Sequence, residues 1–443
     1  MKTSFLIFLT KGVTITGKIL GRKASVFPGK LAYDADPKIL TKVNYPKYVI
    51  GVTGSSGKGS TIELIEHGLK KAGYSVACNK SGSNGIYAIT TLILNNVTIF
   101  KKNPKKDVFL IELDERHIKL AFLKPTLTHL VVTNITRDQP VRNKTPEFIY
   151  DNIFSAVKSK THLIINADDP MVNKITTTYQ DKITTYGINK TKYDYLKPKI
   201  NAVDNAYCPL CHTKLIYDYY HYGHLGNYKC PNKDFKRGNV DYEGTDVNLE
   251  NKTMKINNHL VKINKDILYA AYATLASYTT LKTIGIDDKI INETYNTDPI
   301  KAKRGNVYKI FNRDLIMLES KNENALSYYQ SLEYITRTKG KKTIILGFDN
   351  VSRRYKYNDL SWLYDVEFEK LNDSNIDKII CIGRFKYDVA TRLSYANIDE
   401  KKIVLLKDIN NLLKVVKKTK GKIFTMVCFD MTERIKNLVG DLK

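Results

Sequence analysis

A glycine-rich stretch near the start of the chain combines the residue types that bind phosphate. The stretch, GVTGSSGKGST over residues 51–61, follows the apolar run 48–50 and precedes a helical pattern. Gly54 and Gly57 permit a turn whose backbone amides point inward, and the following helix offers its positive end to an anion. The stretch therefore predicts a nucleotide-phosphate loop, with an ordinary glycine turn between a strand and a helix as the alternative.

The lysine of this loop gives it a specific chemistry. The spacing differs from the common G-x-x-x-x-G-K-[ST] pattern, because Gly59 follows Lys58 directly and the hydroxyl comes one residue later, at Ser60. Lys58 can still reach the β- and γ-phosphates, and Ser60 can offer its hydroxyl to Mg²⁺. The loop residues expected to contact ATP are Gly54, Ser55, Ser56, Gly57, Lys58, Gly59 and Ser60.

Two carboxylates follow a second apolar run. In LIELDERH, residues 110–117, Glu112 and Asp114 leave the end of an expected buried strand. At the carboxyl edge of a parallel sheet, a carboxylate can hold Mg²⁺ or its waters. Carboxylates at the ends of strands are more often simply solvated. The metal site is therefore inferred because the predicted phosphate loop belongs to the same sheet.

Alternating apolar runs and helical patterns must position these groups. The first series of β-branched runs comprises residues 48–52, 107–113, 128–134 and 161–169. Runs that are apolar throughout indicate a parallel sheet buried on both faces, so this region is predicted to be α/β. The second series comprises residues 343–348, 378–383, 402–406 and 423–429, and it predicts a separate C-terminal Rossmann-like α/β domain. Between the two series, a helix is expected over residues 266–286, with Gly285 as its cap.

Length and composition narrow the class of protein. A chain of 443 residues, 42% of them apolar and 26% charged, is expected to fold into two or three globular domains. It contains no apolar stretch of the roughly 18 to 20 residues that a membrane span needs and no signal-peptide pattern, so we expect a cytoplasmic protein. The net charge of +26 comes from scattered lysines. We therefore expect no nucleic-acid partner, and we expect the basic surface to favour peripheral contact with an anionic membrane.

Five ordered motifs resemble the central domain of the Mur ligase family. They are TGSSGKGST, KSGSNG (80–85), LIELDE, TNITRDQ (133–139) and NADDP (166–170). The segments GRKASVFPGKLA (21–32) and DNVSRRYKYNDLSWLYDVEFEKL (349–371) are similar to the MurT-like branch of that family, which includes lipid II isoglutaminyl synthases, and archaeal pseudomurein peptide ligases are also Mur-like. The resemblance implies a leader over residues 1–45, a P-loop ATPase domain over 46–300 with a zinc-ribbon-like module at 205–240, and a C-terminal domain over 301–443.

The resemblance also implies roles for matching residues. Lys58, Glu112 and Asp138 would serve the reaction, in which ATP activates a carboxylate of a cell-wall peptide precursor as an acyl phosphate for attack by an amine. Further nucleotide contacts would be Asn134, Gln139, Arg304 and Asp349. The Mg²⁺ ligands would be Ser60, Ser81, Ser83 and Glu112. Asp359 matches an aspartate that completes the catalytic triad of a GatD-like glutaminase subunit, and a helix N-cap is its alternative role.

Three cysteines lie close together in the sequence, in CPLC (Cys208 and Cys211) and in CPNKD (Cys230). The resemblance implies four zinc ligands, but Lys233 stands where the fourth cysteine is expected. A C-x-x-C pair with one more cysteine can still hold structural Zn²⁺ if another side chain completes the site. The candidates for this fourth ligand are His212, His221, His224 and Asp234. The alternative is a module that has kept its fold without a metal.

Departures from the MurT-like pattern bear on the attacking amine. LYAAYATLA (268–276) replaces an Asn-rich helix signature, KYND (356–359) replaces DGRD, and ESKNENALSYY (319–329) lacks a Pro-Ala-Gly sequence. Because these segments lie where the amine would arrive, we expect an amino acid as the amine, in murein or pseudomurein synthesis. Amidation with ammonia from a GatD-like glutaminase is the alternative. A basic nucleic-acid-binding P-loop ATPase is a second alternative.

Overall fold

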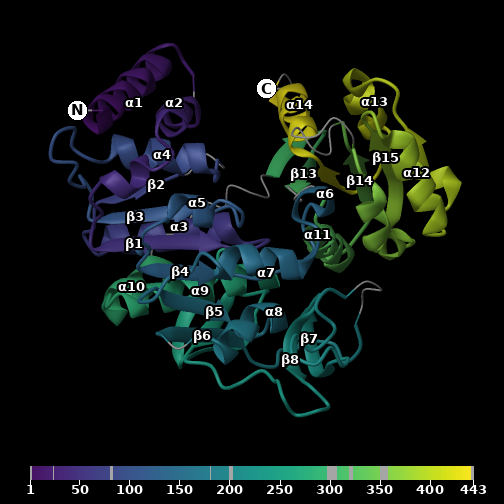
Figure 1. Ribbon diagram of the computed structural model, residues 1–443. Helices are drawn as coiled ribbons and strands as arrows, with labels where there is room; N and C mark the ends of the chain where they lie inside the picture. Colours follow the sequence, from purple (N-terminus) through teal and green to yellow (C-terminus); the bar gives the residue numbers. More distant parts are fainter. Residues whose placement is uncertain are drawn as a thin grey trace. The chain divides into compact units, whose positions relative to one another are not determined.

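The chain folds into two compact units (Figure 1). The structure is a computed structural model that describes residues 2–22, 24–79, 83–179, 181–198, 203–296, 307–318, 323–349 and 358–440. The first unit holds residues 1–136, 146–197 and 205–300, and the second holds residues 137–145, 198–204 and 301–443. Two short segments from the middle of the chain therefore belong with the C-terminal region.

A nine-stranded sheet forms the centre of the first unit, in the order β11-β10-β9-β6-β5-β4-β1-β3-β2. The strands are β1 (Tyr48–Thr53), β2 (Val76–Cys78), β3 (Val108–Glu112), β4 (His129–Val132), β5 (His162–Asn166), β6 (Ile183–Ile188), β9 (Tyr242–Asn248), β10 (Thr253–Ile256) and β11 (His259–Lys262). Strands β1 to β6 and β9 are parallel, and β10 and β11 add an antiparallel edge. The predicted α/β fold with a buried parallel sheet is confirmed, since the central strands are apolar and buried on both faces.

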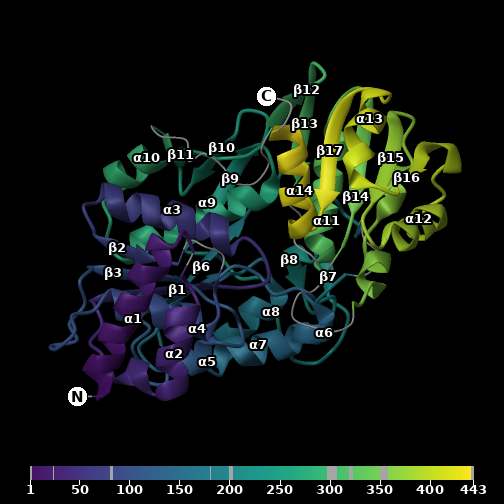
Figure 2. The ribbon, with the colours of Figure 1, turned by 90° about the horizontal axis from the view of Figure 1, so that it is seen from above.

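Helices cover both faces of this sheet (Figure 2). One layer contains α3 (Lys58–Lys71), α9 (Leu268–Thr283) and α10 (Asp288–Asn296). The other contains α4 (Ile86–Asn95), α5 (Ile118–Ala121), α7 (Pro146–Phe154) and α8 (Pro170–Asn173), and the 3-10 helix η2 (Lys174–Thr177) follows α8. The predicted cap of α9 is confirmed: Gly285 has a φ of +85°, and its N–H donates to the Lys282 carbonyl oxygen over 3.0 Å.

The N-terminal region consists of two helices that pack outside α4. They are α1 (Lys2–Ile19) and α2 (Phe27–Ala35), and the 3-10 helix η1 (Ile39–Lys42) follows. Helices α2 and α4 approach to backbone distance, because a Cβ on Gly29 would lie only 2.0 Å from the Tyr87 carbonyl oxygen. The segment expected as a leader is thus part of the packed first unit.

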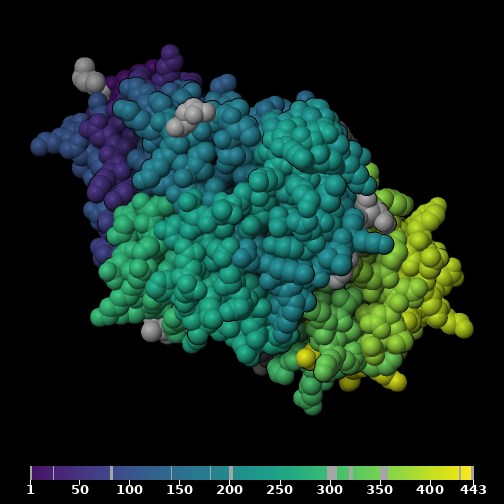
Figure 3. All heavy atoms as spheres, turned by 90° about the horizontal axis from the view of Figure 1, so that it is seen from below, coloured from purple at the N-terminus to yellow at the C-terminus, as the bar shows by residue number. Residues whose placement is uncertain are grey.

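A small module of residues 205–240 forms a two-stranded sheet of β7 (Ile216–Tyr222) and β8 (Leu225–Lys229). Its own core contains Cys208, Leu215, Tyr228, Cys230 and Phe235. The module is anchored by the fully buried Asp168, which accepts hydrogen bonds from Arg237 Nε at 2.5 Å and from the Tyr272 hydroxyl at 2.6 Å. In the space-filling view of Figure 3 its teal surface is continuous with the blue residues of the first unit.

The second unit has a six-stranded sheet in the order β12-β13-β17-β14-β15-β16. The strands are β12 (Val307–Ile310), β13 (Arg313–Leu318), β14 (Lys342–Gly347), β15 (Ile376–Ile382), β16 (Ile403–Leu405) and β17 (Lys422–Val427), and all pairings except β12–β13 are parallel. The helices are α6 (Pro140–Asn143), α11 (Ala325–Arg337), η3 (Ser361–Asp365), η4 (Phe368–Leu371), α12 (Lys386–Tyr395), η5 (Glu400–Lys402), η6 (Ile409–Asn411), α13 (Leu412–Lys417) and α14 (Phe429–Gly440). The four strands predicted for the C-terminal domain are confirmed.

Candidate nucleotide-binding site

The glycine-rich loop links β1 to α3 at the carboxyl edge of the sheet. Gly54 has a φ of +123°, and a Cβ there would lie 2.3 Å from Thr133 Oγ1, so no side chain fits. Gly57 has a φ of +83° and directly precedes α3. The loop is therefore shaped by two glycines, and it ends at the first helical turn, whose amides have no acceptor within the helix.

The residues after β4 brace this loop. The Ser55 amide donates to the Asn134 carbonyl oxygen (2.8 Å), and the Ser56 amide donates to Asn134 Oδ1 (3.1 Å). The Thr133 hydroxyl donates to the Ser56 carbonyl oxygen (2.7 Å), and Ser55 Oγ bonds to the backbone of Thr136. Ser55, Ser56 and Asn134, which were predicted to contact ATP, also brace the loop through these hydrogen bonds.

Lys58 is buried at the start of α3. Its Nζ lies 2.7 Å from Glu115 Oε1 and also donates to the Gly54 carbonyl oxygen, and both charged side chains are almost fully buried. Glu115 follows the two carboxylates that sequence reasoning selected, and its importance was missed. The partner of the lysine in this structure is thus a carboxylate of the protein itself. A bound phosphate would compete with this carboxylate for the ammonium group.

Glu112 faces the same helical turn from the end of β3. Its Oε2 lies 3.9 Å from the place that a Cβ on Gly59 would take, and its Oε1 accepts from Asn84 Nδ2 (3.2 Å). The Asn79 side chain bonds to the Glu112 backbone at both N (2.8 Å) and O (2.9 Å) and also to the Ser83 carbonyl oxygen (3.2 Å). A carboxylate held beside a helix that carries Ser60 suits Mg²⁺, which prefers oxygen ligands.

The remaining predicted metal and strand-end residues are distributed as follows. Asp114 is buried and accepts from the Arg116 amide (3.2 Å), so its carboxylate is committed to a local turn. The predicted ligand Ser81 lies outside the described residues.

Asp138 and Gln139 belong to the second unit. Asp138 is buried and accepts from Asn324 Nδ2 (3.1 Å), while Asn324 Oδ1 accepts from the Ser327 amide (2.8 Å) and caps α11. The Gln139 amide donates to the Glu323 carbonyl oxygen (2.9 Å). Sequence reasoning noted the segment that contains Asn324 but assigned no role to this residue.

Two further predicted residues lie in the second unit. Asp349 follows β14, where its Oδ1 accepts from the Arg384 amide (2.9 Å) and its Oδ2 lies 2.5 Å from Arg434 Nη1. Asp359 Oδ1 accepts from the Ser361 amide (2.9 Å) in a local turn just before η3. The N-cap residue of η3 is Leu360, without a side-chain cap, so Asp359 does not take the N-cap position named as its alternative. Burial raises the pKa of nearby Asp365, and the negative charges of Asp204 and Asp359 add to the shift. Arg304 lies outside the described residues.

The cysteine cluster has a defined fourth member. Among the described residues, potential ligand atoms of Cys208, Cys211, Cys230 and Asp234 all lie within 4.8 Å of one another. Two similar turns present them: the Cys208 amide donates to the Thr213 carbonyl oxygen (2.8 Å), and the Cys230 amide donates to that of Phe235 (2.7 Å). Lys233, at the position where the fourth cysteine was expected, has a φ of +63° in the second turn. The next residue, Asp234, is the one whose carboxylate lies beside the three sulfurs. A set of three sulfurs and one carboxylate oxygen fits tetrahedral Zn²⁺.

Two histidines named as alternative zinc ligands have other partners. His221 Nδ1 lies 2.7 Å from Asp194 Oδ1 and its Nε2 lies 2.9 Å from the Ile188 carbonyl oxygen. His224 Nε2 lies 3.0 Å from Asp169 Oδ2. Both rings are buried in the contact between the module and the sheet, so they anchor the module, and the cysteine cluster does not include them.

Strand, glycine loop, buried lysine and strand-end carboxylate together define a P-loop nucleotide-binding α/β protein. The family description "Mur ligase middle domain" matches residues 52–232, and "MurT ligase C-terminal" matches residues 321–429. The chain belongs to the Mur ligase family.

Individual relatives agree with this assignment. The lipid II isoglutaminyl synthase (glutamine-hydrolyzing) subunit MurT of Staphylococcus aureus is 29% identical over 406 residues, which cover 91% of this chain and 90% of the relative. The corresponding Streptococcus pneumoniae subunit is 26% identical and covers 90% and 88%. A pseudomurein peptide ligase type C from Methanothermus fervidus has a similar fold, with a TM-score of 0.69 at 22% identity over 92% of this chain and 81% of that one.

Proposed function

We propose that this protein is an ATP-dependent ligase that forms an amide bond on a carboxylate of a cell-wall peptide precursor. The single observation that supports this proposal most strongly is the braced loop with Lys58 buried at its end, opposite Glu112. Membership of the Mur ligase family, whose members couple ATP to amide-bond formation, supports the reaction class.

The residues of this site have separable tasks. The amides from Gly57 to Ser60 bind the phosphates, and Lys58 moves from Glu115 to the β- and γ-phosphate oxygens. Its positive charge offsets the repulsion between an attacking carboxylate and the γ-phosphate, so that an acyl phosphate can form. Glu112 and Ser60 would hold Mg²⁺, which when bound neutralises charge on the phosphates. Asn134 keeps the loop in its binding shape through Ser56.

Ammonia is the amine that the comparisons support. The two MurT subunits resemble this chain over about nine-tenths of its length, and their printed names describe glutamine hydrolysis. A GatD-like glutaminase subunit would then supply the ammonia, and Asp359 would face that partner. The substrate of those relatives, lipid II, indicates a lipid-linked precursor.

An amino acid is the second candidate amine. Sequence departures favour it, since KYND, LYAAYATLA and ENAL replace three MurT-like signatures. In that case the protein would extend the precursor peptide without a partner subunit. Arg304, Asp349, Asp138 and Gln139 keep their proposed place near the nucleotide under either reaction.

Structural zinc is also part of this proposal. Cys208, Cys211, Cys230 and Asp234 would bind one Zn²⁺ that joins the two turns of the module. The small core of this module makes such a link valuable for its stability.

Substitution of the loop lysine tests the proposed reaction. Lys58→Ala should lower ADP release with a cell-wall peptide precursor and ammonium by at least about a hundredfold, because the phosphate charge is no longer offset. Lys70→Ala, at an exposed position of the same helix, is the matched control. Undiminished turnover by a folded Lys58→Ala protein would refute the site. DNA binding without any amide product would instead favour a nucleic-acid-binding ATPase.

A further inference from the structure

Helix α1 exposes its large apolar side chains. Phe5 and Phe8 are each 61% exposed, Ile15 is 59% exposed and Ile19 is 79% exposed. The side that faces the protein instead buries two threonines beside Leu6 and Ile7. The Thr10 hydroxyl donates to the Leu6 carbonyl oxygen (2.8 Å), and the Thr14 hydroxyl donates to that of Thr10 (2.7 Å). The helix is thus attached through one face and leaves a second apolar face uncovered.

The exposed residues form one continuous stripe. Phe5, Phe8, Ile15 and Ile19, with Gly12 between the two pairs, follow one another at spacings of three and four residues, so at 3.6 residues per turn they fall within an arc of about 80°. The buried residues Leu6, Ile7, Thr10 and Thr14 lie on the opposite side of the helix. Scattered exposed apolar side chains need no explanation, but an aligned stripe along a whole helix indicates a contact surface.

The charge along helix α1 is entirely positive, and the first acidic side chain, Asp34 of α2, is paired with Lys30. The first 33 residues contain six basic residues, namely Lys2, Lys11, Lys18, Arg22, Lys23 and Lys30, and no Asp or Glu. By helical geometry Lys2 and Lys18 flank the stripe on its two sides. An identical helix from a second copy would bring like charges together, whereas an anionic lipid surface would attract them.

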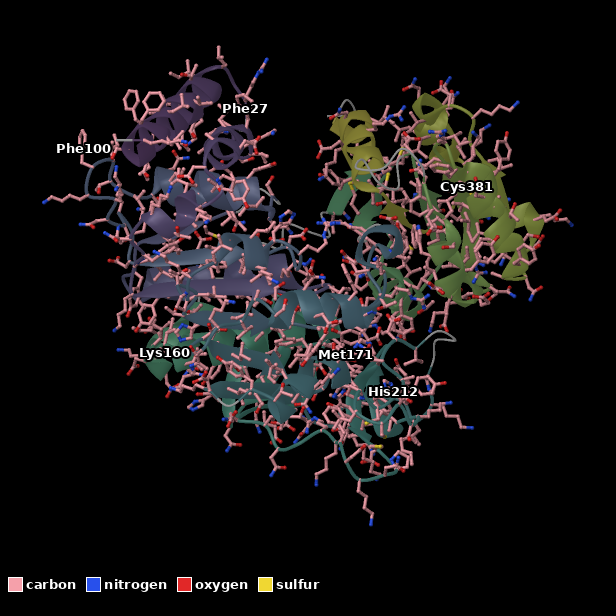
Figure 4. All side chains as sticks on the ribbon, in the orientation of Figure 1. Phe27, Phe100, Lys160, Met171, His212 and Cys381 are labelled. Carbon is pink, nitrogen blue, oxygen red and sulfur yellow. The ribbon has the colours of Figure 1, made fainter. Side chains whose placement is uncertain are left out.

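Neighbouring segments extend this surface. Phe27, at the start of α2, is 59% exposed, and Phe100 is 85% exposed and precedes Lys101 and Lys102. Figure 4 labels Phe27 and Phe100 on either side of α1, at the same end of the first unit. Aromatic side chains with adjacent lysines suit the boundary between headgroups and acyl chains.

We propose that α1, with Phe27 and Phe100, docks this protein onto an anionic lipid surface. The helix lies in the plane of the interface with Phe5, Phe8, Ile15 and Ile19 among the acyl chains and its lysines among the headgroups. None of the helices in the described part of the chain has the length and apolarity to span a bilayer, which agrees with interfacial binding. This inference goes beyond the proposed ligase reaction, and it can be measured without nucleotide or precursor.

Vesicle binding tests the proposal. The full chain is sedimented with vesicles of phosphatidylglycerol and phosphatidylcholine, and separately with vesicles of phosphatidylcholine alone. We expect binding to the anionic vesicles, with weaker binding at high salt. The triple substitution F5Q/F8Q/I15Q should lower the partition coefficient at least about tenfold, and K2Q/K18Q should lower it roughly fivefold per charge.

A matched control distinguishes binding through this surface from nonspecific hydrophobic binding to vesicles. L196Q/L260Q removes two apolar side chains, 72% and 59% exposed, elsewhere in the first unit and should leave vesicle binding unchanged. Equal binding by the wild type and the triple variant would overturn the proposal. Loss of a wild-type dimer in the triple variant, without vesicle binding by either protein, would assign the stripe to a second copy and also overturn it. Because ATP turnover is measured separately, failure of the proposed function leaves this result intact.

Discussion

At the residue scale, the central finding is that Lys58 has a buried carboxylate partner. A lysine meant for phosphate would be costly to bury alone, and Glu115 supplies the missing charge. Glu115 also sets a competition, because ATP must replace it as the partner of the ammonium group. The residue that stabilises the nucleotide-free loop is therefore expected to weaken nucleotide binding.

This competition can be measured with Glu115→Gln. Removing the charge while keeping the shape leaves Lys58 with an uncompensated buried charge, so the nucleotide-free protein should lose about 3–5 kcal/mol of stability. A nonhydrolysable ATP analogue with Mg²⁺ should then raise the Tm more in the variant than in the wild type, since phosphate restores the missing anion. Glu293→Gln, at an exposed site, should change neither value. An equal or smaller ligand-induced shift in Glu115→Gln would contradict the exchange of partners.

At the element scale, adjacent parallel strands bring side chains together that are distant in sequence. Strand β4 starts with His129 and β5 with His162, and the two rings lie 5.3 Å apart. Burial, with repulsion between the rings and from Lys182, lowers the pKa of His129 from 6.5 to about 4, and burial with Lys182 does the same for His162. Both rings therefore stay neutral in the fold at pH values where the unfolded chain protonates them.

This pair predicts a loss of stability in mild acid. Between about pH 6.5 and pH 4 the unfolded chain binds more protons, so stability that is complete above pH 6.5 falls as the pH falls through this window. We expect the free energy of unfolding to drop by about 2–4 kcal/mol more in the wild type than in H129Q/H162Q between pH 7.5 and pH 5. Urea unfolding followed by circular dichroism measures this difference. Parallel losses in the two proteins would show that the histidines are not responsible.

The cysteine module provides a second prediction at this scale. If Asp234 completes the zinc site, Asp234→Ala should lower zinc affinity at least about tenfold, because three ligands remain. Asp234→Cys should retain zinc, and His212→Ala, beside Cys211, should behave like the wild type. Zinc per chain after dialysis against a buffered free-zinc concentration decides among these outcomes. Full zinc retention by Asp234→Ala would exclude the aspartate as a ligand.

At the scale of the whole molecule, the second unit is assembled from three parts of the chain. Residues 137–145 and 198–204 join residues 301–443. The Asp138–Asn324 and Arg137–Asp365 contacts connect the first of these segments to the C-terminal region, and Arg137 also contacts Asp204 of the second segment. The C-terminal region is thus built around segments that leave the central sheet. Asp359 lies in this unit, so a glutaminase subunit that uses Asp359 would have to bind to the surface of the second unit.

Asp359→Asn distinguishes the two amines. The Oδ1 of asparagine can accept the same hydrogen bond from the Ser361 amide, so the turn before η3 should survive while the charge is lost. With a GatD-like glutaminase present, glutamine-dependent ADP release should fall at least about a hundredfold, and the reaction with free ammonium should persist. Asp408→Asn changes an aspartate that likewise accepts from the amide two residues later, that of Asn410 at the start of η6, and is the matched control. Consumption of an amino acid by the protein alone, with no effect of glutaminase, would contradict ammonia as the amine.

The sequence by itself determined eight of the parallel strands, the helix that ends before Gly285, the glycine loop and the family, because these depend on local periodicity, turn residues and short motifs. Only the tertiary structure decided which side chains meet. Placement of β1 between β3 and β4 brings Glu115 to Lys58 and Asn134 to Ser56, and packing of two similar turns selects Asp234 over His221 and His224. Such pairings depend on strand order and on burial, which no short stretch of sequence contains.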